Sequence, residues 1–235
     1  MLNNLPNYIS IVFVLTVLLT LLMIYSAIKK SANEKSNSIV ITVILGLTGW
    51  IIIQSLLAFN DFYNTDTKFF PPKFLLAVAP MFITIIFLFI TKKGRAFIDR
   101  LPLLNITYLN IVRIPVELVL YWLALNKAVP ELMTFAGRNF DILAGITAPF
   151  VAYVGFSLKK LKTKMILLWN FIALGLLINI VTNAVLSAPF SFQRFAFDQP
   201  NIAVLYFPFI LLPAFIVPVV LFGHLVSIRL LIGKK

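Results

Sequence analysis

Five polar residues with chemically useful side chains lie at spacings of three or four within one apolar segment: Thr107, Asn110, Arg113, Glu117 and Tyr121. This spacing places them on one face of a helix. A charged residue at mid-depth in a bilayer costs roughly 2.5–3.5 kcal/mol, so we expect Arg113 and Glu117 to face the protein interior. The two residues are four apart and can pair. The pair is either a structural ion pair or a binding site.

If this face is a binding site, its two charged residues would have different roles. Arg113 would hold an anionic or hydrogen-bonding solute, and Glu117 would balance its charge or carry a proton, with Asn110 and Tyr121 beside them. Further polar residues are expected at a similar outer depth in other segments: Gln54, Asn179 and Asn183. The two asparagines are one helical turn apart and would serve equally well to pack helices together.

The connection over residues 127–141 mixes polar residues with Leu, Met and Phe. A solvated connector needs no such apolar content, so we predict that the segment dips back toward the bundle and lines a cavity. Glu131, Arg138 and Asp141 would then close the polar site from outside. Asp141 would serve equally well as the N-cap of the next helix.

Composition places these residues in a membrane protein. Apolar residues form 61% of the 235 positions and charged residues 12%, against roughly 45–50% and about 25% in soluble domains. The apolar runs have the length needed to cross a bilayer of about 30 Å. We predict an all-α, polytopic protein with a single transmembrane domain over residues 1–235. Its seven spans are 7–28, 39–59, 73–91, 103–126, 142–158, 165–186 and 202–231. The fifth is short, and Pro208, Pro213 and Pro218 are expected to bend or break the seventh.

The distribution of basic residues predicts the orientation, because Lys and Arg prefer cytoplasmic loops. Fourteen lie after the first, third, fifth and seventh spans: Lys29, Lys30, Lys35, Lys92, Lys93, Arg95, Arg100, Lys159, Lys160, Lys162, Lys164, Arg229, Lys234 and Lys235. Five lie on the opposite side: Lys68, Lys73, Lys127, Arg138 and Arg194. The N-terminus is therefore predicted outside and the C-terminus in the cytoplasm, with the first span retained as a helix.

Similar short sequences indicate an internal repeat. Lys29 matches Lys159, Gly46 matches Gly175, and Pro80 matches Pro213, at offsets of 129 to 133. A parallel duplication would relate residues 7–91 to 142–231, joined by the helix 103–126. This three-plus-one-plus-three layout resembles the architecture of sugar-efflux and vitamin-uptake transporters. The resemblance implies a solute site at the repeat interface. No motif of either family is present, so no residues are carried over.

Several chemistries are disfavoured by the residue types. The chain has no cysteine and one histidine, His224, which excludes thiolate sites and argues against zinc. We therefore predict no metal and no cofactor. His224 is expected far in depth from the carboxylates. The net charge of +12 comes from residues at helix ends, where they meet lipid headgroups, so the expected partner is the lipid bilayer and not nucleic acid.

Three functions remain open for a protein of the cell membrane, of the bacterial inner-membrane type. The leading one is the binding or transport of a small solute in an outward-opening polar site. The second is an enzyme embedded in the membrane that acts on lipid or isoprenoid substrates, with Glu117, Glu131 and Asp141 as acid–base groups. The third is a receptor or subunit that acts only in a complex. The ligand would be a small molecule or lipid-like.

Overall fold

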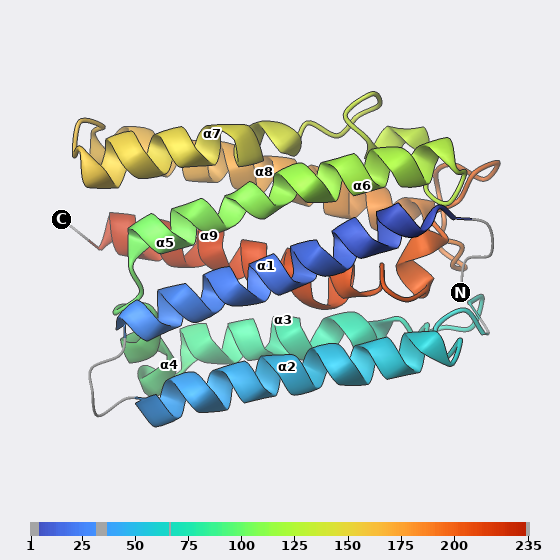
Figure 1. The fold of residues 1–235 in the computed structure, drawn as a ribbon, viewed down its shortest axis with the longest axis horizontal. Coiled ribbons are helices and arrows are strands. Elements are labelled where there is room, and N and C mark those ends of the chain that lie inside the picture. The colour runs from blue at the N-terminus through green and yellow to red at the C-terminus, as the bar shows by residue number, and fades with distance from the viewer. Residues whose placement is uncertain (1–4, 32–36, 66, 234–235) are drawn as a thin grey trace.

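The computed structural model describes residues 5–31, 37–65 and 67–233, and every regular element in those ranges is helical. The all-α prediction is therefore confirmed for the described part of the chain. The long helices run side by side along a common direction (Figure 1). Lys35, Lys234 and Lys235, which contribute to the basic count, lie outside the described residues.

The chain order of the elements follows the predicted apolar segments. The α-helices are α1 Asn7–Ser31, α2 Asn37–Phe59, α3 Leu75–Ile90, α4 Lys92–Ile98, α5 Leu103–Tyr108, α6 Arg113–Leu125, α7 Ile142–Ala152, α8 Thr163–Ser187 and α9 Val217–Ile232. The 3₁₀ turns are η2 Leu109–Val112, η3 Glu131–Met133 and η5 Ala203–Leu205, and the π turns are η4 Tyr153–Ser157 and η6 Leu212–Ile216. Thus η2 joins α5 to α6, η4 extends α7, and η6 leads into α9.

The described residues contain five helical segments long and apolar enough to cross a membrane: Asn7–Ser31, Ser38–Phe59, Leu103–Leu125, Thr163–Ser187 and Leu212–Ile232. The pair α3 and α4 would make a sixth span, but the two helices meet at a bend of 93°. The fifth predicted segment forms the shorter apolar helix Ile142–Ser157. Large apolar side chains such as Leu15, Leu22 and Leu45 are exposed on the outer faces, as expected for contact with lipid.

The last helix begins at Leu212, later than the predicted start at residue 202. Proline explains the irregular backbone here, because it has no N–H to donate. In a regular α-helix the Ala214 carbonyl would accept from the N–H of residue 218, and that residue is Pro218. Trp50 of α2 replaces this donor, with its indole Nε1 2.9 Å from the Ala214 oxygen. The π turn η6 is thus tied to α2.

The helix α7 begins near the middle of the bundle and not at its end (Figure 1). Its first turn packs on the centre of the column formed by α5, η2 and α6, where a Cβ on Gly145 would lie 2.9 Å from Ile114 Cγ1 and 3.2 Å from the Ile114 nitrogen. A larger residue here would force Ile114 or its backbone to shift. The chain after α6 therefore turns back into the bundle before Asp141, which is why the fifth apolar segment is short.

Candidate functional site

An ion pair lies at the point where α7 meets α6. Arg113 and Asp141 are 2% and 4% exposed, and Arg113 Nε is 3.1 Å from Asp141 Oδ2. Arg113 Nη2 also donates to the Ala173 carbonyl of α8, at 3.0 Å. The ion pair thus connects α6, α7 and α8 at the level of the centre of the Leu103–Leu125 segment.

The ion-pair partner of Arg113 differs from the one that the spacing suggested, which was Glu117. Side chains on a helix lean toward its N-terminus, so Arg113 leans away from Glu117 one turn later. The close approach at Gly145 brings Asp141 to the same depth as Arg113. Although Asp141 occupies the N-cap position of α7, its side chain makes no capping hydrogen bond.

Glu117 is 1% exposed and makes a different contact. Its Oε1 accepts from Asn139 Nδ2 at 2.5 Å, while Oε2 has no hydrogen-bond partner among the described residues. Asn139 also donates to the Met133 carbonyl at 3.0 Å, and its Oδ1 accepts from the Asp141 backbone N–H at 2.9 Å. Sequence reasoning missed Asn139, although its place two residues before Asp141 in an apolar connection could have indicated it.

Other residues of the polar face have local partners. Asn110 is buried and donates to the Thr107 carbonyl at 3.1 Å, while its Oδ1 has no hydrogen-bond partner in the described structure. Tyr121 stacks on Phe135, with ring centroids 4.9 Å apart. Tyr121 therefore contacts the connection that follows α6 through its ring.

The remaining predicted residues lie in two separate groups. Gln54 accepts a hydrogen bond from the buried Tyr63 hydroxyl, and burial raises the pKa of Tyr63 to about 12. Asn179 donates to the Arg138 carbonyl at 2.9 Å, and Asn183 donates to Asn179 Oδ1 at 3.3 Å. These two asparagines therefore fasten the returning connection to α8.

Two residues that were expected to close the site do not reach it. Glu131 and Arg138 have exposed side chains, because η3 and the turn after it present them outward. Asp141 is the member of the predicted group of three that joins Arg113.

The single histidine lies closer to the ion pair than its sequence position suggested. His224 is fully buried, and its Nδ1 is 3.1 Å from Asn170 Oδ1. Asn170 precedes Ala173, which accepts from Arg113, by three residues on α8. Three residues along a helix span about 4.5 Å. His224 therefore lies about one helical turn beyond the arginine.

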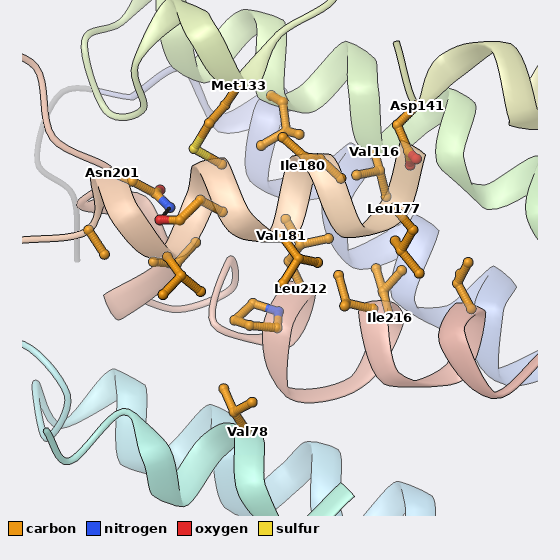
Figure 2. A pocket seen from close by; sticks show the side chains of 18 of the residues that line it. Val78, Val116, Met133, Asp141, Leu177, Ile180, Val181, Asn201, Leu212 and Ile216 are labelled. Atoms are coloured by element: carbon orange, nitrogen blue, oxygen red, sulfur yellow. Dashed lines mark hydrogen bonds between the residues drawn. The ribbon is translucent and has the colours of Figure 1, made fainter. Parts of the chain in front are cut away.

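A cavity of about 100 Å³ adjoins this cluster. Three buried ionisable residues line it, namely Arg113, Glu117 and Asp141, and most of its other walls are aliphatic or aromatic side chains from α3, α6, α8, η6 and α9. Figure 2 shows Asn201 and Asp141 at opposite ends of the row of lining residues. The apolar walls differ from the polar pocket that the sequence indicated.

The cavity reaches the surface between α3 and α8. Its partly exposed lining residues include Val78 and Phe82 of α3, Val181 and Val185 of α8, and Leu212 of η6. Figure 2 shows Val78 across an open space from Val181 and Leu212. Since these helices expose apolar side chains, the opening faces the region that lipid would occupy. Among the described residues, no group of three or more His, Asp or Glu is placed to hold a metal ion.

A family model for a domain of unknown function, DUF8737, matches residues 71–232. The chain belongs to this family. The DUF8737 match includes every residue that lines the cavity and the whole ionisable cluster, whereas α1 and α2 precede it. No curated protein and no solved structure matches the chain.

Proposed function

We propose that this membrane protein binds a small, largely apolar molecule that carries one polar group. The ligand enters from the bilayer between α3 and α8, and its polar group meets the cluster of Arg113, Glu117 and Asp141. One observation carries this proposal: an apolar cavity ends on three buried ionisable side chains. Purely structural ion pairs do not need a cavity beside them. The cavity of about 100 Å³ is smaller than the roughly 150 Å³ that takes up benzene, so it holds the polar end of a longer ligand while the rest of the chain extends through the opening between α3 and α8.

Cavity filling tests the proposal. Val181→Phe would fill the space beside α3, while Ile178→Phe on the same helix makes a similar change at an exposed position outside the cavity lining. Dodecanol should raise the melting temperature of the wild type and of Ile178→Phe, because a ligand that binds only the folded state stabilises it. Val181→Phe should show little or no rise. Equal rises in all three proteins would refute binding in the cavity.

Transport of the ligand is the extension that we favour. The backbone is irregular around the cavity, with a 3₁₀ turn at η2, a π turn at η6 and the mid-depth start of α7. Such interruptions mark hinges and binding sites in transporters. Flux of a radiolabelled ligand into liposomes that contain the wild type, compared with Val181→Phe, tests this. Binding without flux would leave a receptor or subunit, and chemical conversion of a lipid substrate would indicate an enzyme.

We also propose seven membrane crossings in a cell membrane of the bacterial inner-membrane type, with the N-terminus outside and the C-terminus in the cytoplasm. The helices at the seven predicted segments and the 14-to-5 division of basic residues support this arrangement. Because the chain has no cysteine, single cysteines report cleanly. A cysteine at Gln193 should react with an impermeant maleimide in intact cells, and one at Lys162 should not. The reverse pattern would overturn the orientation.

We also propose a parallel repeat, in which residues 7–91 correspond to residues 142–231. The matched sequences support it, although α3 bends sharply into α4 whereas α9 continues without a break. An experimental structure should superpose α1–α3 on α7–α9 with the same helix order and handedness. A different order would refute the duplication.

A further inference from the structure

The charges around the cavity do not balance. Arg113 and Asp141 form a pair of opposite charges, which leaves the buried Glu117 without a cationic partner of its own. Asn139 supplies a neutral donor to Oε1 only. A buried charge without compensation is costly, so one further positive charge or one proton is required at Glu117.

Within the described ranges, no other element around Glu117 supplies that charge. The lining residues from α3, α8, η6 and α9 contain no titratable side chain. Elsewhere on α9, the buried His224 is engaged by Asn170 and Arg229 pairs with Asp99. On the returning connection, Lys127 and Arg138 have exposed side chains. The adjacent helix α1 has no charged residue before Lys29. Arg113 is already shared between Asp141 and the Ala173 carbonyl. The missing charge must therefore come from solvent, as a proton, or from the ligand.

An arginine alone would favour an anionic ligand, but the charges of this cluster favour a cationic one. An anionic ligand would add a negative charge beside a guanidinium that Asp141 already balances, even with Glu117 protonated. A cationic group beside Glu117 Oε2 would instead bring the buried charge to zero, and that oxygen has no hydrogen-bond partner in the described structure. The cavity walls match an apolar chain that carries such a group.

We propose that the ligand is an apolar amine in its protonated form and that it replaces a proton on Glu117. In the empty protein Glu117 is a neutral carboxylic acid. When the ammonium group binds, the carboxyl O–H bond breaks, one proton leaves to solvent, and the carboxylate pairs with the ammonium. One proton is released for each amine bound. This inference rests on the proposed function, because it specifies the ligand of the same cavity.

Three probes with the same chain separate the two proposals: dodecylamine, dodecanol and dodecanoate. Wild-type protein should bind dodecylamine most tightly. Glu117→Gln should weaken dodecylamine by about tenfold to a hundredfold, because a hydrogen bond between charged groups is lost, and should weaken dodecanol much less, because a neutral hydroxyl can bond to the amide as well as to the acid. Equal affinities for the amine and the alcohol, or a preference for dodecanoate, would overturn the amine inference while cavity binding stands. Failure of all three probes to bind would overturn both.

The proton can be observed without any variant. The infrared spectrum of the empty wild type should contain the carbonyl stretch of a protonated carboxylic acid, and dodecylamine should remove it. Glu131→Gln is the matched control, because it removes an exposed carboxyl outside the cavity lining and should keep the change, whereas Glu117→Gln should abolish it. A spectrum in which the amine leaves the carboxylic acid signal intact would refute the exchange.

Discussion

Breaking the ion pair between Arg113 and Asp141 should cost different amounts from its two sides. Arg113→Met leaves Asp141 buried without a counter-charge, at 4% exposure. Asp141 would then have to take up a proton. The ordinary pKa of aspartate lies about three units below pH 7, so protonating Asp141 at pH 7 costs about 4 kcal/mol of the free energy of unfolding. This value agrees with the roughly 3–5 kcal/mol seen when one partner of a buried pair is removed.

The opposite change should be milder. In Asp141→Asn, Glu117 can lose its proton and become the counter-charge for Arg113 one turn away, so only hydrogen bonding is lost, at about 1–3 kcal/mol. Removing both acids with Glu117→Gln and Asp141→Asn leaves the arginine alone and should cost about 3–5 kcal/mol. Arg113→Met with Asp141→Asn should cost less than Arg113→Met alone, because no buried charge remains unpaired.

Unfolding in mixed micelles titrated with dodecyl sulfate would give the free energies for this set of variants. Equal losses of unfolding free energy for Arg113→Met and Asp141→Asn would refute the idea that Glu117 can replace Asp141 as the counter-charge of Arg113. Negligible losses for every single variant would show that the pair is not buried in the folded protein.

Three further changes test the packing. Trp50→Phe should lower the free energy of unfolding by about 1–3 kcal/mol, because a buried carbonyl loses its donor; an unchanged value would mean that the indole bond is dispensable. Gly145→Ala should destabilise the protein by about 1–3 kcal/mol through overpacking. A Cβ on Gly175 meets nothing within 4 Å, so Gly175→Ala should be neutral or stabilising by up to about 1 kcal/mol. Equal effects of the two changes would contradict the close helix contact at Gly145. For Tyr63 the folded state holds the phenol proton more tightly, so wild-type stability should fall relative to Tyr63→Phe as the pH rises from 10 toward about 12; parallel pH profiles would contradict that burial.

The sequence was most informative about what must be kept from lipid. The apolar lengths predicted helices at all the segments, and the spacing of Arg113 and Glu117 predicted one face, which is buried at both residues. The reason is the cost of placing a charged side chain against lipid, which can be evaluated for each helix separately. The same applies to the connection 127–141, whose apolar content indicated its return toward the bundle.

Pairings across helices were harder to predict. The partner of Arg113 depends on the depth at which α7 begins, and that depth depends on the contact of Gly145 with Ile114. Neither is encoded in the spacing of one segment. The cavity has the same origin, because its walls come from several elements that are distant in the chain. Asn139 reaches Glu117 only because the returning connection 127–141 places it there, and the sequence of that connection alone does not give this position.

The most direct test is to locate the ligand itself. Crystals of the protein could be grown in a lipid mesophase with an alkylamine that carries a terminal bromine, and anomalous scattering would then locate the bromine. We expect the signal inside the cavity beside Val78 and Val181, with the amine next to Glu117. Bromine found only on the lipid-facing surface, with the cavity closed by protein side chains, would contradict the proposed function.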